Sequence, residues 1–216
     1  SEVAVMFPEF VAPDGRVDWN MRVKGVAVNN VLPTAGLIAD LTSLAKTLVQ
    51  YPEVKRILTF SNEVRQNKLA EVNWSWVCKK VLDNSALSKS AKKLFWQVLN
   101  DDQYNSAGIT DHNVAIKRAK SHERYAIGSC KVFGRGYDDK FSPKHHAAIH
   151  FDAKNIVTTV QEIWRVTRLD KNDAGKPIGG DANAYYILPM RYNDLSDTPN
   201  WSEGRLGQLK GILQSN

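Results

Sequence analysis

The sequence is poor in cysteine and has no long apolar run. Its two cysteines, Cys78 and Cys130, are too few for a disulfide framework in 216 residues, and the CxxC spacing of many zinc sites is absent. No stretch approaches the roughly 18 consecutive apolar residues that span a membrane. Residues 1–10 show neither the basic lead nor the apolar core of a secretion signal. We therefore expect a soluble protein with free thiols in a reducing, cytoplasmic compartment and with no membrane partner.

What the sequence does contain is a local excess of positive charge. The chain has 29 basic and 23 acidic residues, which gives a formal net charge of +6. Residues 117–146 hold eight of the basic residues and three of the acidic ones, so this segment supplies most of the excess. All five histidines lie in or beside it. A charge run is often only a solvated face, but this clustering favours a polyanionic partner.

Aromatic residues and glycines are interleaved with these charges. Residues 133–137 read FGRGY, in which the glycines beside Arg135 let the backbone approach a phosphate closely. Cations neutralise phosphates and rings stack on unpaired bases, which is how single-stranded nucleic acid is bound. The segment does not fit the RNP1 pattern, so it predicts no particular fold. We predict a nucleic-acid interface, for RNA rather than DNA, formed by Lys117, Arg118, Lys120, Arg124, Tyr125, Lys131, Phe133, Arg135, Tyr137 and Lys144.

Helical periodicity dominates residues 36–124. The clearest stripe begins at Leu37, where apolar residues recur at i, i+1, i+4, i+7, i+8, i+11 and i+12. Further helices are indicated where a proline or a capping side chain precedes an apolar stripe. The predicted helices run from 37 to 49, from Pro52 through Leu58, from Asn62 to about Leu82, from Ser88 or Ser90 through Leu99, and from Thr110 or Asp111 through Ala119.

The two ends of the chain differ from this helical part. Residues 1–35 have prolines and glycines among short apolar groups, which suits an extended arm packed on its own body or on a neighbouring subunit. Residues 156–169 and 184–192 are rich in Val, Thr, Ile and Tyr and flank a turn-rich loop. We prefer a β-hairpin here, although the first of these stretches also suits a helix. Residues 195–216 have the character of a second arm.

These elements predict a mainly α protein of the α+β class, with a helical bundle core over about residues 36–124, an extended N-terminal arm, and a C-terminal β-hairpin plus arm. The single domain divides into an arm at 1–35, the helical core with its basic loop at 36–155, the hairpin at 156–194 and an arm at 195–216. This layout resembles, in outline and without a matched motif, viral nucleocapsid and coat proteins, whose arms hook neighbouring subunits along a genome. The resemblance implies a sequence-tolerant RNA-binding protein that forms homo-oligomers through its terminal arms, in the cytoplasm or within a virion or ribonucleoprotein.

Two other functions remain open at this point. The chain can be a small nuclease or phosphodiesterase, in which one imidazole deprotonates a 2′-hydroxyl and a cation stabilises the phosphorane. Its catalytic candidates are His122, His145, His146 and His150. The last two are four residues apart, as metal ligands on one helix face are, but no HExxH is present and we expect neither a metal nor a cofactor. The second alternative is a protein-interaction module in which the basic charge is incidental.

Overall fold

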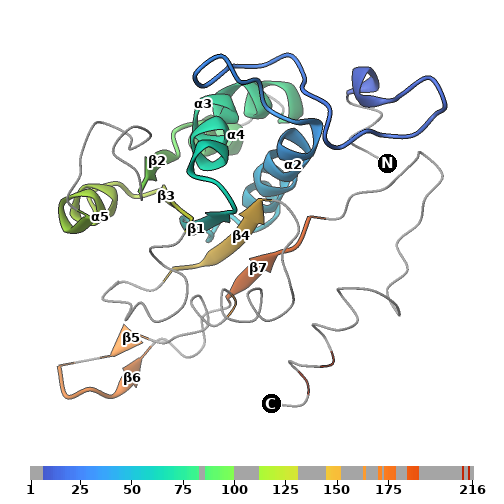
Figure 1. Cartoon of the computed structure of the whole chain (residues 1–216). Helices are drawn as coiled ribbons and strands as arrows, with labels where there is room; N and C mark the ends of the chain where they lie inside the picture. The colour runs from blue at the N-terminus through green and yellow to red at the C-terminus, as the bar shows by residue number, and fades with distance from the viewer. Residues whose placement is uncertain are drawn as a thin grey trace.

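A parallel β-sheet organises the chain. The computed structural model describes residues 7–82, 86–99, 112–130, 145–151, 163, 170–171, 173–178, 184–189, 211 and 214. Within them, five strands form one sheet in the order β2-β3-β1-β4-β7, and every neighbouring pair is parallel (Figure 1). The strands are β1 (Arg56–Ser61), β2 (Phe95–Val98), β3 (Tyr125–Ser129), β4 (Ala147–Phe151) and β7 (Tyr185–Ile187).

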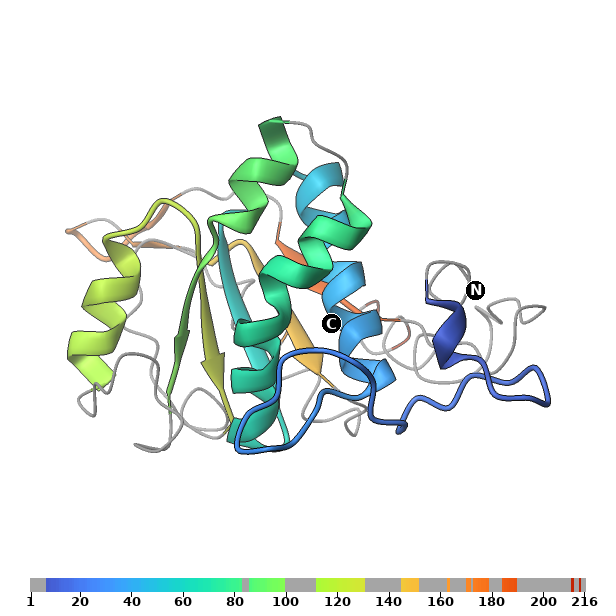
Figure 2. The ribbon, with the colours of Figure 1, turned by 90° about the horizontal axis from the view of Figure 1, so that it is seen from above.

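Helices cover both faces of this sheet. The helical elements are η1 (Pro8–Phe10), α2 (Ala35–Gln50), α3 (Val64–Val81), α4 (Ala86–Lys92) and α5 (His112–Lys120). Seen from above, α2, α3 and α4 lie on one side of the sheet and α5 lies on the other (Figure 2). Parallel neighbours cannot be joined by a hairpin, and accordingly α3 and α4 connect β1 to β2, and α5 connects β2 to β3. In the described part of the chain, none of these helices combines the length and the apolar character needed to cross a membrane.

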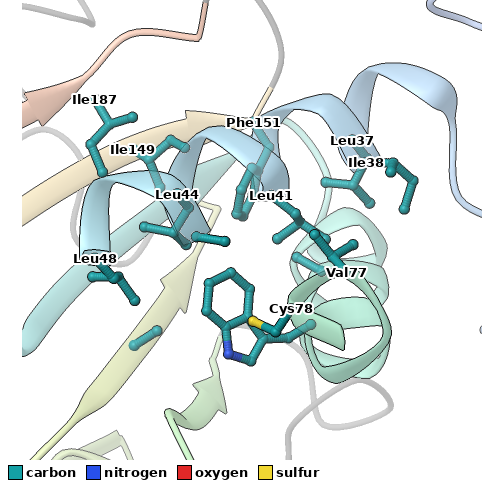
Figure 3. Close-up of a cluster of buried hydrophobic side chains, with 14 of the residues drawn as sticks. Leu37, Ile38, Leu41, Leu44, Leu48, Val77, Cys78, Ile149, Phe151 and Ile187 are labelled. Carbon is teal, nitrogen blue, oxygen red and sulfur yellow. The ribbon is translucent and has the colours of Figure 1, made fainter. Parts of the chain in front are cut away.

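The larger core fills the space between the sheet and α2, α3 and α4. Leu41 and Leu44 of α2 and Val77 of α3 pack toward Ile149 and Phe151 of β4, and all five are at most 1% exposed (Figure 3). Full burial of each such side chain contributes about 1.5–3 kcal/mol. This layer therefore supplies much of the free energy that holds the sheet.

A second, smaller cluster lies under α5. Ala115 and Ala119 of α5 contact the opposite face of the sheet, where Leu58 and Ile127 are buried. Because both faces are covered, β3 and β4 are buried along their whole lengths. Such strands read as short apolar runs and lose the alternation that marks a half-exposed strand.

The N-terminal segment, residues 7–34, packs on its own body. Phe7 and Phe10 are buried and their rings stack with centroids 4.9 Å apart. The amide of Ala35 donates to the carbonyl of Met21 at 2.9 Å, which ties the segment to the start of α2. Figure 2 shows the segment running beside the α2 and α3 layer. This is one of the two placements expected for an N-terminal arm, and residues 1–6 lie outside the described residues.

The predicted helical bundle core is wrong, because strands occupy part of two of its predicted helices. The helix expected from Pro52 through Leu58 is replaced by β1, and α4 ends at Lys92 before β2 begins at Phe95. Both stretches are short apolar runs, which periodicity alone cannot assign to a helix or to a buried strand. Pairing on both sides of β1 decides the matter in favour of the sheet. The helices predicted for 37–49, for 62–82 and around 112–119 are confirmed by α2, α3 and α5.

The predicted C-terminal hairpin is also corrected. Strand β7 does lie within the predicted 184–192 strand, but it pairs in parallel with β4 and therefore belongs to the main sheet. The two-residue strands β5 (Asp170–Lys171) and β6 (Pro177–Ile178) form an antiparallel pair inside the stretch expected to be a loop. Apart from Ile163, the first predicted strand, 156–169, lies outside the described residues, as do residues 195–216 apart from 211 and 214.

One buried side chain fixes how β1, β3 and α3 meet. The amide of Asn67 donates to the Ser61 hydroxyl at 2.7 Å and to the Ser129 carbonyl at 3.1 Å, while Thr59 Oγ1 donates to its Oδ1 at 2.8 Å. Asn67 is fully buried, so these bonds also meet the need of a buried amide for partners. A Cβ on Gly128 would lie 2.9 Å from Asn67 Oδ1. The absence of a side chain at Gly128 therefore leaves the space that the Asn67 side-chain amide occupies.

We expect Gly128→Ala to lower the free energy of unfolding by about 1–3 kcal/mol, the usual cost of forcing extra volume into a packed site. Asn67 cannot simply turn aside, because three hydrogen bonds hold it. Urea denaturation measures the change, and Gly211→Ala is the control because a Cβ there meets nothing within 4 Å. Combining Gly128→Ala with Asn67→Ala should cost less than the sum of the two. Full additivity would contradict this explanation.

Candidate functional site

Cations gather at the edge of the sheet where the strands begin. Lys55 and Arg124 stand directly before β1 and β3, and Lys93 stands two residues before the start of β2. Parallel strands begin at a common edge, so these residues are neighbours although they are far apart in the sequence. The amide of Phe95 donates to the Arg124 carbonyl at 3.0 Å, which confirms the proximity of β2 and β3 at this point.

The last turn of α5 adds further charge at this edge. Helix α5 follows β2 and leads into β3, so it ends where the strands begin. Its last turn contains Lys117, Arg118 and Lys120, of which the first two are exposed. Cations are favoured at a helix C-terminus because they face the negative end of the helix dipole.

An exposed stack of rings lies beside these cations. The imidazole of His122 is nearly coplanar with the Phe95 ring, at an interplanar angle of 2° and a centroid distance of 4.0 Å. The guanidinium carbon of Arg118 is 5.7 Å from the same Phe95 centroid. His122 is exposed and Phe95 is partly buried. We call the combined face the amino-edge surface, and it consists of Lys55, Lys93, Phe95, Lys117, Arg118 and His122.

An ion pair compensates the negative charge of an acid beside this surface. Lys55 Nζ lies 2.8 Å from Glu123 Oε1, and this hydrogen bond lowers the pKa of the exposed Glu123 carboxyl. The carboxylate is thus neutralised by a neighbouring cation. The remaining exposed cations of the surface, Lys93, Lys117 and Arg118, face no acid in any ion pair recorded for the described residues.

The predicted nucleic-acid interface is only partly assembled by the described residues. Lys117 and Arg118 share the exposed face of α5, and Lys120 is half-buried. Arg124 donates instead to the carbonyls of Val54 and Pro52, at 3.4 and 3.2 Å. The remaining predicted contacts, Lys131, Phe133, Arg135, Tyr137 and Lys144, lie outside the described residues.

Tyr125 does not lie on this surface. It is 1% exposed, and its ring belongs to the core cluster under α5. Its hydroxyl lies 3.3 Å from Nε2 of His145, which is also buried. The ring therefore offers no face to a base, and the contact predicted for it is not carried further.

The four candidate catalytic histidines differ in burial and in contacts, although His145 and His146 are adjacent and interact electrostatically. His122 stacks on Phe95, and His145 is buried against Tyr125. His146 Nδ1 accepts from the amides of Lys55 and Arg56, at 2.9 and 3.2 Å. His150 is buried at the far end of β4, about 13 Å along the strand from His146 at the usual rise per residue.

The spacing of His146 and His150 is also found between metal ligands, although the sequence led us to expect no metal. The described residues contain no group of three or more His, Cys, Asp or Glu side chains that could hold a metal ion. Of the four histidines, His145 and His146 are close enough to interact, but His145 is only 1% exposed and so presents no imidazole to a bound strand. The described geometry therefore gives the nuclease alternative no assembled catalytic group.

Three residues of the amino-edge surface were missed by sequence reasoning. Lys55, Lys93 and Phe95 lie in stretches that were assigned to helices, so their place at the start of a strand was not recognised. A signal for them exists in hindsight: a lysine or arginine stands just ahead of each of β1, β2 and β3.

Burial lowers the pKa of His145 to about 3, and the nearby cations Arg56 and Lys120 add to the effect. In the unfolded chain this imidazole takes up a proton near its ordinary pKa of about 6.5. In the folded protein it stays neutral down to a much lower pH, so the unfolded state binds more protons between these two values. We expect the free energy of unfolding to fall as the pH drops below 6.5, by up to about 1.4 kcal/mol per pH unit. His145→Gln should reduce this dependence on pH by up to about 1.4 kcal/mol per pH unit, which corresponds to one proton. Urea denaturation at a series of pH values between 7 and 5 measures the free energy of unfolding of both proteins. Parallel pH profiles for the two proteins would contradict the assignment.

No protein-family model matches the chain, and no curated protein matches its sequence. A parallel sheet covered by helices on both faces hosts many unrelated activities. Evidence for function therefore comes from the charges, exposure and contacts of the described residues.

Proposed function

We propose that this protein binds single-stranded nucleic acid, RNA in preference to DNA, through the amino-edge surface and without strong sequence preference. The observation that carries the proposal is the exposed imidazole of His122, stacked on Phe95 at 4.0 Å beside the guanidinium of Arg118. Phe95 supports one face of the imidazole, and the other face can receive an unpaired base. Stacking of this kind contributes about 1–3 kcal/mol per base and tolerates any sequence.

The cations around this stack suit the phosphates of the same strand. Lys93, Lys117 and Arg118 are exposed, and the last two lie in the final turn of α5, four to five residues before His122. Each phosphate contact releases condensed counterions, which makes binding favourable at low salt. Rings next to cations favour a strand whose bases are splayed out, as in the loops and ends of RNA, over a duplex whose bases are stacked.

Self-assembly along the bound strand is part of the proposal. Residues 7–34 pack on their own body. We therefore assign the contacts with neighbouring subunits to residues 1–6 and 195–216. Size-exclusion chromatography with absorbance at 260 and 280 nm tests both parts, because a coat-like protein elutes with nucleic acid at a mass far above 24.2 kDa. A reducing compartment, the cytoplasm or a ribonucleoprotein within it, suits the two free cysteines.

Removing two cations should weaken binding through charge. We expect Lys117→Gln combined with Arg118→Gln to reduce affinity for an unstructured single-stranded RNA about tenfold or more at low salt. The slope of log K against log salt should decrease by about 1.4, because each lost contact to a single strand accounts for about 0.7. Fluorescence anisotropy over a series of salt concentrations measures both quantities.

The matched control is Arg16→Gln combined with Lys24→Gln, which removes the same charge from exposed positions of the N-terminal segment. It should keep the wild-type affinity and slope. Wild-type binding that does not depend on salt would overturn the proposal. Equal affinity for duplex RNA would remove the preference for single strands. Cleavage of the RNA would favour a nuclease, and the metal-free histidine mechanism predicts that this cleavage persists when EDTA is added.

Removing the ring of His122 should weaken binding in a different way. His122→Ala should weaken binding by about 1 kcal/mol or more, because a stacking contact is lost. The slope of log K against log salt should stay unchanged, because no phosphate contact is removed. His122→Phe keeps a ring over Phe95 and should retain most of the affinity. If the alanine variant binds as the wild type does, the stack is not a base platform.

A further inference from the structure

A polar pocket lies at the opposite edge of the sheet, where β1 ends and α3 begins. Its volume is about 250 Å³, and its polar lining consists of Asn20, Arg22, Thr34, Asn62, Glu63, Arg65 and Gln66. Leu37 of α2 and Leu69 of α3 provide the apolar part of the wall. The pocket thus joins the N-terminal segment, the β1–α3 turn and the first turns of two helices.

The strand order makes this edge the expected place for a ligand. From β1 the chain passes by way of α3 and α4 to β2, which lies on the β3 side of β1, whereas β4 and β7 lie on the other side. Open parallel sheets bind ligands outside the carboxyl ends of their strands where the direction of winding reverses. The β1–α3 turn, with Asn62 and Glu63, stands at this reversal.

The charges of the pocket favour an anion. The guanidinium groups of Arg22 and Arg65 oppose the single carboxylate of Glu63. Helices α2 and α3 both begin here, and each N-terminus adds roughly half a positive charge to the two guanidinium groups of the lining. The N-cap Glu63 makes no side-chain capping hydrogen bond to α3. The site therefore combines two planar cations with the positive ends of two helices.

The two arginines are held in place by different parts of the protein. Arg22 Nη1 donates to the Leu32 carbonyl at 2.7 Å, which leaves further donors of this exposed guanidinium for a ligand. Arg65 is half-buried and its Nε atom is buried, so its side chain has limited freedom. A guanidinium that is already positioned loses less entropy when it binds a phosphate.

The volume limits what the pocket can hold. Pockets for drug-sized molecules measure about 300–1,000 Å³, and a water molecule takes about 30 Å³. The pocket thus has room for a phosphate group and part of the group attached to it. We propose that it binds the phosphate of a small phosphomonoester, a nucleoside monophosphate being the largest class that fits with its base outside the pocket.

Calorimetric titration tests this site with AMP, adenosine and inorganic phosphate as probes. The titrations use the full chain carrying Lys117→Gln and Arg118→Gln, so that failure of the amino-edge surface and failure of this pocket can be told apart. AMP and phosphate should bind and adenosine should not. If neither AMP nor phosphate binds at millimolar concentration, the proposal is wrong, whatever the amino-edge surface does.

Variants of the lining give changes of opposite sign. Arg22→Gln and Arg65→Gln should each weaken AMP binding about tenfold or more, the usual effect of losing a charged hydrogen bond. Glu63→Gln should strengthen binding, because it removes the one acid from the pocket. Lys79→Gln, at the other end of α3, is the matched control and should bind as the parent does. Equal affinity in all four variants would overturn the proposal.

Backbone amides provide a readout that does not depend on a variant folding. In a ¹⁵N–¹H spectrum, phosphate and AMP should shift the amides of Val64, Arg65 and Gln66 in the first turn of α3. The amides of α5, which lies on the other face of the sheet (Figure 2), should be much less affected. Shifts confined to the amino edge of the sheet would place the anion elsewhere and contradict this site.

Discussion

The amide of Asn67 is the contact on which the arrangement of β1, β3 and α3 depends. It reaches the hydroxyl of Ser61 in β1 and the carbonyl of Ser129 in β3 from the first turns of α3. A buried amide without partners would cost several kcal/mol, so the three elements are stable only in the relative positions that satisfy it. Those positions put the start of α3 directly behind the end of β1, and they bring Gly128 within contact distance of the same side chain. This contact therefore fixes the relative position of β1 and β3, on which both edges of the sheet depend.

The parallel arrangement gives the sheet two chemically different edges. At one edge lie the residues that precede β1, β2 and β3 together with the last turn of α5, and the charge there is carried by lysines and arginines on the surface. At the other edge the β1–α3 turn and the first turn of α2 enclose a small pocket in which two arginines meet. An extended, open cationic face suits a polymer of phosphates, whereas an enclosed cationic pocket suits a single one. The two proposed sites therefore differ in the form of their ligand while they share its chemistry.

The helices with long stripes were predictable from the sequence. Helices α2 and α3 each bury one face against the sheet, and the spacing of their apolar residues shows it. Strand β1 was not predictable by the same means, because RILTFS is buried on both faces and carries no alternation. Its identity as a strand depends on Tyr125 and Ala147, which pair beside it from much later in the chain. Local patterns contain no information about such partners.

The site residues also divide into those that local sequence reveals and those that only the fold brings together. Lys117 and Arg118 were predicted as nucleic-acid contacts because they are close together in the sequence and lie on one helix, and the structure shows them exposed. Lys93 and Phe95 join them only through the pairing of β2 with β3. The pocket was missed entirely, since Arg22 and Arg65 come together only when the N-terminal segment folds across the α2 and α3 layer. Tyr125 looked like a base contact because an aromatic residue among cations has the same sequence pattern whether it faces solvent or the core.

The central place of β1 has a consequence for how the chain folds. Ile57 pairs with Ala126 on one side and with Ala147 on the other, so a growing chain exposes β1 for some seventy to ninety residues of synthesis before either partner exists. Helices α2 and α3 make local contacts and can form early, whereas closing the sheet requires loops that are slow to form. During that interval the apolar RILTFS stretch has unpaired backbone groups along both sides, which is the condition under which strands associate with other chains. Packing of α2 and α3 can cover one face of this segment during that interval, but its backbone edges stay unpaired until β3 and β4 have been made.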